Sequence, residues 1–275
     1  MSRLLSALAL LAVATASVQA QTTLFNSNGF EAGSGYVLGD LNGQNGWIVD
    51  TPPGTFAVQN SVVAGGTQAV QVTPGSPATT NWIFPLLGFT PGPTDGVRIQ
   101  VDLARTIGTT ASFGYDIDVY NAAVSRTLRF GLLNNAGVIQ PFVTSRFLSG
   151  NFDPTGAVTN VIVGGAVPAN TFVNFDAVLN YSTQSFRLKL NGVDVGFNMP
   201  FADLTATDIS DADFQISTTA NANDIGFMDN YIVSVVAIPE PVSMALACCG
   251  VAASGLFYWR RRVNRNKQLD QVVRS

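Results

Sequence analysis

The sequence predicts an all-β protein whose body is an antiparallel β-sandwich. Three observations carry this prediction: apolar and polar residues alternate along several segments, turn-forming residues separate these segments, and no segment of convincing length has a helical period. Alternation with a period of two places one face of a strand on a core and the other toward water. Antiparallel strands with regular turns and no helices are typical of a sandwich or jelly roll.

The chain begins with a segment that is typical of export. Residues 1–20 hold one positive charge at Arg3, an apolar run that starts at Leu4, and small residues at Val18 and Ala20. This order predicts a secretory signal peptide that is cleaved after about Ala20. The alternative is an uncleaved membrane anchor, for which the apolar run is short.

Residues 21–237 are predicted to form one extracytoplasmic β-sandwich domain, because their length suits a single all-β domain. Strands at about 173–181 and 185–190, followed by Asn191-Gly192 and a strand at 193–197, predict an antiparallel meander with a type I′ turn. The alternating apolar positions of the body are Val97, Ile99, Val101, Leu103, Phe113, Tyr115, Ile117, Val119, Leu128, Phe130, Leu132, Val173, Phe175, Ala177, Leu179, Tyr181, Phe186, Leu188 and Leu190.

The C-terminal segment 238–275 carries a second export signal. Residues 242–259 contain no charge, and a helix of this length spans about 27 Å, enough to cross a hydrocarbon core. Basic residues follow at once, and the positive-inside rule places them in the cytoplasm. The sequence therefore predicts one C-terminal transmembrane helix with the body outside the inner membrane; the alternative is a buried core helix. The basic residues are Arg260, Arg261, Arg262, Arg265 and Lys267.

Pro239, Glu240 and Pro241, followed by a hydrophobic helix and an arginine cluster, resemble the PEP-CTERM sorting signal. The resemblance covers about residues 237–267. It implies an exported protein that is held in the inner membrane by its C-terminal helix and processed by an exosortase near the Pro-Glu-Pro. The processed protein is then expected at the cell surface or outside the cell, in a bacterium that makes exopolysaccharide.

The body carries a second resemblance. Phe30-Glu31 with Tyr36, followed by the glycine-rich segment 39–47, is similar to the N-terminal segment of concanavalin A-like jelly rolls in secreted bacterial proteins. Asn191-Gly192 and its flanking strands resemble their middle hairpin, and residues 229–233 resemble their closing strand. The resemblance implies a lectin/glucanase-like sandwich of two antiparallel sheets.

The composition excludes several kinds of site. The chain has no histidine, and its two cysteines are the adjacent Cys248 and Cys249. It therefore has no Ser-His-Asp triad, no His-ligated zinc and no disulfide framework in the body. Residues 21–238 hold seven basic and sixteen acidic residues, a net charge of −9, which argues against binding to nucleic acid.

Catalytic carboxylates are sparse. The resemblance implies that hydrolases of this fold use two closely spaced glutamates in a Glu-x-Asp-x-x-Glu pattern, but the body has a single glutamate, Glu31. Asp116 and Asp118 are an alternative pair, because residues two apart on a strand share a face. The core-facing residues between them place both on the opposite, solvated face. We therefore expect no catalytic residues and no enzyme activity.

Carboxylates and tryptophans supply the remaining candidates. Carboxylates in a loop suit calcium, although solvated turn residues are the favoured interpretation and no cofactor is required. Tryptophans can stack on sugar rings, although core packing is favoured for both Trp47 and Trp82. The calcium candidates are Asp208, Asp211 and Asp213, with Asp224, Asp229 and Asn230 as a second group, and the sugar-binding candidate that we retain is Trp47.

These features together predict a non-catalytic cell-surface or extracellular-matrix protein that is sorted by its C-terminal signal and binds polysaccharide. The expected partners are an exosortase-type processing enzyme, the inner membrane and exopolysaccharide, with no nucleic acid. The alternative is a secreted glycan-active enzyme that uses aspartates on the jelly-roll sheet.

Overall fold

The structure is a computed structural model that describes residues 21–49, 55–74, 81–106, 113–216 and 224–238. The predicted signal peptide, the Pro-Glu-Pro, the apolar span 242–259 and the basic tail lie outside the described residues. Within the part of the chain that is described, no helix is long and apolar enough to cross a membrane. Residues 21–237 form one compact unit.

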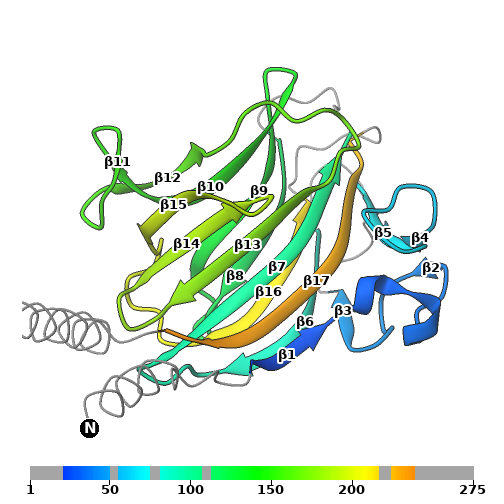
Figure 1. Cartoon of the computed structure of the whole chain (residues 1–275), viewed down its shortest axis with the longest axis horizontal. Helices are drawn as coiled ribbons and strands as arrows, with labels where there is room; N and C mark the ends of the chain where they lie inside the picture. Colours follow the sequence, from blue (N-terminus) through cyan, green and yellow to red (C-terminus); the bar gives the residue numbers. More distant parts are fainter. Residues whose placement is uncertain (1–20, 50–54, 75–80, 107–112, 217–223, 239–275) are drawn as a thin grey trace, which may run out of the picture. The chain divides into compact units, whose positions relative to one another are not determined.

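Nine strands form the first sheet, which we call sheet A (Figure 1). Its strands are β1 (Thr22–Asn26), β2 (Gly39–Asp40), β4 (Thr55–Gln59), β5 (Ala69–Thr73), β7 (Asp95–Arg105), β13 (Val173–Asn180), β14 (Ser185–Leu190), β15 (Val193–Pro200) and β17 (Gly226–Ala237). Eight of them follow the order β15-β14-β13-β7-β17-β5-β4-β2, and β1 pairs with β17.

Eight strands form the second sheet, sheet B. Its strands are β3 (Trp47–Val49), β6 (Asn81–Phe89), β8 (Phe113–Tyr120), β9 (Arg126–Asn135), β10 (Val138–Leu148), β11 (Asn151–Phe152), β12 (Ala157–Ile162) and β16 (Ile209–Ile216). Seven follow the order β11-β10-β9-β8-β16-β6-β3, and β12 pairs with β10. Neighbouring strands in both sheets are antiparallel, as in the pairing of β8 with β9.

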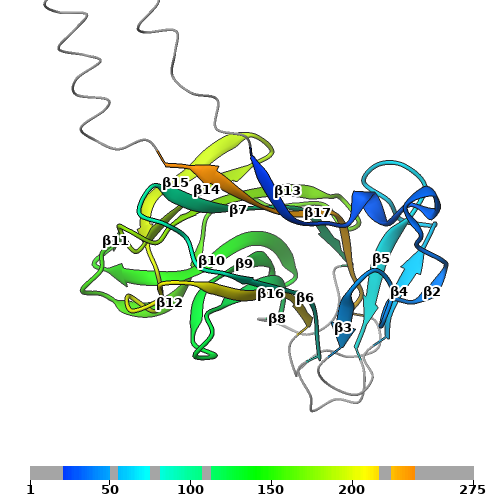
Figure 2. The same ribbon diagram turned by 90° about the horizontal axis from the view of Figure 1, so that it is seen from below.

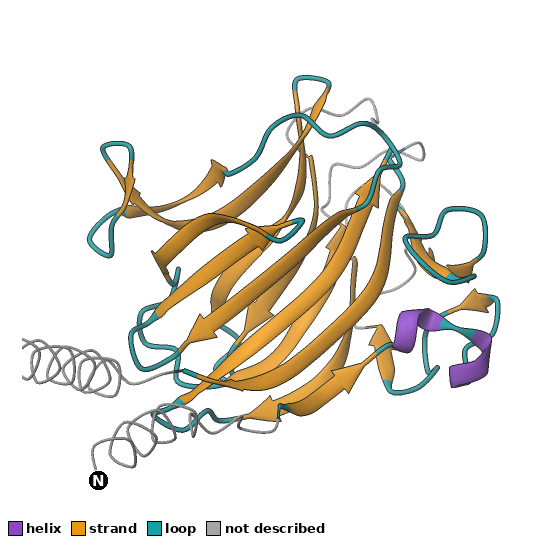
Figure 3. Ribbon diagram, viewed as in Figure 1, coloured by secondary structure: helices purple, strands orange, loops and turns teal. Residues whose placement is uncertain are grey.

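The two sheets lie as separate layers in Figure 2. Strands dominate the described chain (Figure 3), and its helical parts are the short 3₁₀ turns η1 (Asn28–Phe30) and η2 (Ala32–Ser34). The predicted two-sheet antiparallel sandwich is therefore confirmed. It follows from the period-two pattern, which gives every long strand one apolar face that must be covered.

The core lies between the two sheets and is built from the alternating positions. Every predicted core residue whose side chain is described is buried. Phe130 of sheet B packs against Phe175 of sheet A with ring centroids 5.6 Å apart. The meander is also confirmed, because β13, β14 and β15 pair in order. Asn191 and Gly192 both have a positive φ, which a type I′ turn requires.

An aromatic cluster closes one side of the sandwich. Trp47 is 1% exposed and its ring lies 5.2 Å from Phe25 and 5.3 Å from Tyr231 of the closing strand β17. Its indole N–H donates to the Tyr36 hydroxyl at 3.1 Å. The glycine-rich N-terminal segment thus packs against the closing strand, so Trp47 stabilises the fold.

Candidate functional site

The candidate site is a network of polar side chains on the face of sheet B that points away from sheet A, which we call the outer face. The register places side chains from adjacent strands next to one another there: Gln215 opposite Trp82 and Asp116, Asp213 opposite Asp118, Asp211 opposite Tyr120, and Arg129 opposite Asp118 and Thr144. Because directly opposite residues share a face, alternation with the buried core set brings all of these residues to the outer face.

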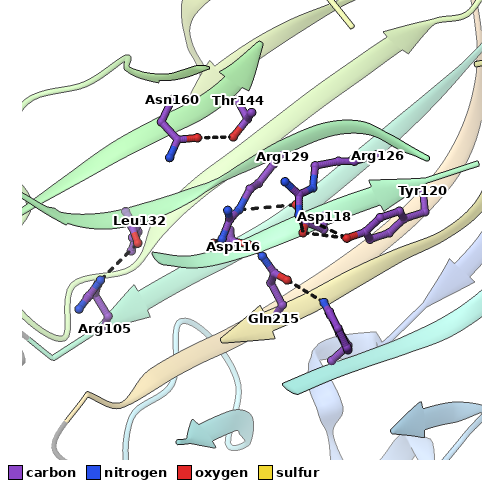
Figure 4. Close-up of polar contacts among 11 residues, drawn as sticks. Arg105, Asp116, Asp118, Tyr120, Arg126, Arg129, Leu132, Thr144, Asn160 and Gln215 are labelled. Carbon is purple, nitrogen blue, oxygen red and sulfur yellow. Dashed lines mark hydrogen bonds and ion pairs between the residues drawn. The ribbon is translucent and has the colours of Figure 1, made fainter. Parts of the chain in front are cut away.

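Asp116 is at the centre of the network and is completely buried. One carboxylate oxygen accepts a hydrogen bond from Arg129 Nη2 at 2.7 Å, and the other accepts one from Gln215 Nε2 at 2.6 Å (Figure 4). The Arg129 guanidinium also lies over the Phe142 ring, 5.6 Å from its centroid. The charge of Asp116 is therefore compensated by a partner that is itself held in place.

Asp118 lies two residues further along β8 and is also completely buried. It forms an ion pair with Arg126 at 3.0 Å and accepts a hydrogen bond from the Tyr120 hydroxyl at 3.2 Å. Burial is the larger cause, and the negative charge of Asp116 the smaller, of a pKa of Asp118 that is raised well above its usual range. The positive charges of Arg129 and Arg126 oppose this increase. One of the two carboxyl groups thus takes up a proton more readily than an exposed aspartate.

Trp82 lies beside the network. Its indole N–H donates to Gln215 Oε1 at 2.7 Å, which links it through Gln215 to Asp116. Trp82 and Phe84 are partly exposed, whereas Ile83 between them is completely buried in the core. Leu86, two residues further on, is 67% exposed. The outer face of β6 therefore presents an apolar row next to the polar network.

The structure corrects two expectations. Asp116 and Asp118 do lie on the outer face, but they are buried and not solvated, because long side chains of neighbouring strands cover them. Trp82 was expected in the core, but it lies on the outer face, since the alternation of β6 directs Ile83 inward instead. Trp47, by contrast, lies in the core, as was favoured for it. Its ring is enclosed in the aromatic cluster and offers no face to a sugar.

The calcium candidates do not come together. In the described ranges no group of three or more acidic, histidine or cysteine side chains could hold a metal ion. Asp208 accepts a hydrogen bond from the backbone N–H of Ala122 at 2.7 Å. Asp211 and Asp213 lie along β16, where they face Tyr120 and Asp118.

Asp229, from the second calcium group, has a structural environment. It is completely buried, and one oxygen accepts the backbone N–H groups of Ala64 at 3.0 Å and Gly65 at 3.2 Å. The other accepts the N–H of Asn230 at 2.8 Å. Burial raises the pKa of Asp229 to about 6. This carboxylate fixes a loop to the closing strand, and its oxygens are already used.

Sequence reasoning missed the arginines of the network. Arg126 precedes the core residues of β9, and Arg129 alternates with them. The period-two pattern therefore places Arg129 on the outer face. Gln215 comes to Asp116 across 99 residues of sequence, and only the strand order β9-β8-β16-β6 brings them together. The alternation of residues along β9 could therefore have identified Arg129 from the sequence, whereas no local pattern could have identified Gln215 as a partner of Asp116.

No known family model matches the chain. No curated protein matches it either. Among solved structures, a conserved carbohydrate esterase from the Shiga toxin-encoding bacteriophage phi24B aligns with a TM-score of 0.53 and 15% identity, over 78% of this chain and 99% of that one. A sialidase aligns at 0.48 and 12% over 68% of this chain, which corresponds to only 17% of the sialidase.

A third structure, the CBM22-1 xylan-binding domain of Xyn10C from Paenibacillus barcinonensis, aligns with a TM-score of 0.36 and 13% identity over 81% of this chain and 100% of that one. At these identities the likeness concerns the fold alone. The chain is a two-sheet antiparallel β-sandwich, and this fold is what it shares with the phage structure.

Proposed function

We propose that residues 21–237 form a non-catalytic carbohydrate-binding domain whose ligand lies on the outer face of sheet B. The observation that carries this proposal is the partly exposed indole of Trp82, which hydrogen-bonds at 2.7 Å to Gln215 of the polar network. A sugar ring has an apolar face that packs on an aromatic ring and hydroxyls that need fixed polar partners.

The way in which the aromatic groups are held supports the proposal. Trp82 and Tyr120 both direct their polar atoms into the network, toward Gln215 and Asp118. Each side chain is therefore oriented before a ligand arrives, and both side chains remain partly exposed. Binding then costs less side-chain ordering, which favours affinity for a weakly interacting, hydroxyl-rich ligand.

Substitution of Trp82 tests the proposal. We expect Trp82→Ala to weaken the retention of the full-length protein, purified in detergent, on an immobilised polysaccharide by roughly tenfold, the equivalent of about 1.4 kcal/mol. Phe197→Ala is the matched control, because Phe197 is also an aromatic residue of a strand and is 69% exposed, but belongs to β15 of sheet A. Equal losses in the two variants, or no loss in Trp82→Ala, would contradict the proposal.

The domain is proposed to act outside the cytoplasm. The supporting features are the signal-peptide pattern of residues 1–20 and the order of Pro-Glu-Pro, apolar span and basic cluster in residues 239–267. We propose that an exosortase-type enzyme cleaves near Pro241 after the body has been exported. Mass spectrometry of the surface fraction tests this, since a chain that still carries residues 242–259 would rule out processing.

A glycan-active enzyme is the second candidate function, and the environment of Asp118 favours it. A carboxyl group with a raised pKa beside a second carboxyl group is an arrangement in which acid–base catalysis can divide its roles. Against it, both carboxylates are completely buried and paired with arginine. Incubation with a panel of glycans decides between the two: turnover that is lost in Asp118→Asn would establish the enzyme, and retention without turnover would support the binding domain.

A further inference from the structure

We infer that the glycan held on the outer face of sheet B is uncharged, and not a polysaccharide bearing carboxylate or sulfate groups. This inference rests on the proposed function and concerns the ligand class of the same site. It is carried by the positions of the positive charges of the body, each of which lies in the described part of the chain.

The supply of positive charge is small. Residues 21–238 contain seven basic side chains against sixteen acidic ones. An acidic polysaccharide carries a negative charge at short, regular intervals, and its recognition depends on guanidinium or ammonium groups that are free to pair with it. The decisive question is therefore which cations of the body are available. The seven are Arg98, Arg105, Arg126, Arg129, Arg146, Arg187 and Lys189.

The cations of sheet B already have partners. Arg126 is paired with Asp118 at 3.0 Å and Arg129 with Asp116 at 2.7 Å. Arg146 of β10 donates to the carbonyl oxygens of Ala202 at 3.1 Å and Gly156 at 3.3 Å. An anionic sugar that captured Arg129 would leave the completely buried Asp116 without its arginine partner, a change that costs several kcal/mol. Capture of Arg126 would leave Asp118 with Arg129 alone, at 3.6 Å.

The remaining cations are no better placed. Arg98 is paired with Asp176 at 2.7 Å, and Arg105 is 1% exposed. Arg187 lies 3.6 Å from Asp194. Lys189 is opposite Asp176 on one neighbouring strand and opposite Asp194 on the other, so two carboxylates share its face of sheet A.

The acidic groups of the outer face act in the same direction. Asp211 and Asp213 lie on β16 between Trp82 and Tyr120 in the strand order, where a ligand that contacts both aromatic residues must pass over them. Asp213 is 6% exposed, whereas Asp211 is partly exposed. The carboxylate of Asp211 repels a carboxylate or sulfate, while sugar hydroxyls can donate hydrogen bonds to carboxylate oxygens. A neutral polyhydroxylated ligand therefore fits the charges of this face, and an anionic one does not.

Affinity electrophoresis of the full-length protein in detergent tests the inference. The neutral probes are xylan, glucomannan and dextran, and the acidic probes are alginate, polygalacturonate and heparin. We expect retardation by at least one neutral polymer, with a dissociation constant that changes by less than roughly twofold between about 50 and 500 mM NaCl, because no ion pair forms. We expect no retardation by the acidic polymers at either salt concentration when the assay uses a variant in which the five basic tail residues are replaced by glutamine, so that only the charges of the body can pair with the polymer. These residues are Arg260, Arg261, Arg262, Arg265 and Lys267.

The outcomes separate the inference from the proposed function. Retardation by acidic polymers alone, weakening as salt rises, overturns the inference but leaves carbohydrate binding intact. Retardation by no polymer overturns the proposed function and the inference with it. Lys189→Gln controls for charge outside the site: it should leave retardation by the neutral polymer unchanged, and a loss of that retardation would place the polymer on sheet A and contradict the site on sheet B.

Discussion

Replacing Arg129 with methionine tests whether the polar network is a buried ion-pair system. Arg129 Nη2 lies 2.7 Å from Asp116, and the two side chains are 15% and 0% exposed. At an effective dielectric constant of about 20, charges at this separation attract each other by roughly 6 kcal/mol. Much of that attraction is offset by desolvation, but removing one partner leaves the other charge buried, which costs about 3–5 kcal/mol.

Thermal unfolding followed by circular dichroism measures this cost. In a domain of this size each kcal/mol lowers the melting temperature by about 2–4 °C, so Arg129→Met should melt roughly 6–20 °C below the parent protein at pH 7. Adding Asp116→Asn to Arg129→Met removes the uncompensated charge, and we expect it to restore part of the lost stability. That recovery distinguishes charge burial from the loss of the arginine's packing against Phe142.

Arg187→Met is the matched control for a solvated pair. Arg187 and Asp194 are 38% and 56% exposed and lie 3.6 Å apart, and an exposed pair of this kind contributes less than about 1 kcal/mol. If Arg129→Met costs no more than Arg187→Met, the outer face is solvated as the sequence alone predicts. Trp82 and Tyr120 would then not be held by a buried network, which would contradict an oriented binding site.

Two further predictions concern the buried groups around this network and the closing strand. Burial raises the pKa of Asp229 to about 6, so its folded state favours the protonated form, and its contribution to stability is present at low pH and lost as the pH rises through 6. The melting temperature should therefore fall less between pH 4 and pH 7 in Asp229→Asn than in the parent protein; an equal fall would contradict this assignment. A Cβ on Gly131 would overlap the backbone of Tyr115 and Asp116 on the adjacent strand, so Gly131→Ala should destabilise the domain by about 1–3 kcal/mol in urea unfolding. Gly165→Ala, with open space around the added methyl group, should be close to neutral, and equal effects of the two substitutions would refute the packing argument.

The sandwich follows from local information. Each predicted core position, such as Ile99 or Phe130, is fixed by alternation with polar neighbours, and a shift by one residue would expose the whole apolar set. Asn191-Gly192 fixes the β14–β15 turn in the same local way. These features need no knowledge of which strands are neighbours, and for this reason the sequence predicts them correctly.

The candidate site depends on information that a single strand does not contain. Alternation places Asp116 outward, but its burial depends on Arg129 and Gln215, which come from different strands on either side of β8. The prediction that Trp82 lies in the core is wrong for a related reason. Residues 82–86 are apolar on both faces of the strand, so the pattern alone does not show which face is turned toward the core. The sequence therefore predicts the face but neither its partners nor its solvation.

The outer face of sheet A shows why a row of hydrogen bonds alone does not define a binding site. There Asp102 accepts from Asn174 at 2.8 Å and from Asn230 at 2.7 Å, so the carboxylate is used on both oxygens within the row. These hydrogen bonds link β13, β7 and the bulge of β17. Stabilising the three strands is a sufficient explanation for this row, so it does not indicate a binding site. The network on sheet B is joined at its margins to Trp82 and Tyr120, which donate to Gln215 and Asp118 and are themselves partly exposed. A network that orients partly exposed aromatic rings does more than satisfy its own charges, and the proposed ligand, with an apolar face and hydroxyl groups, would complement that arrangement.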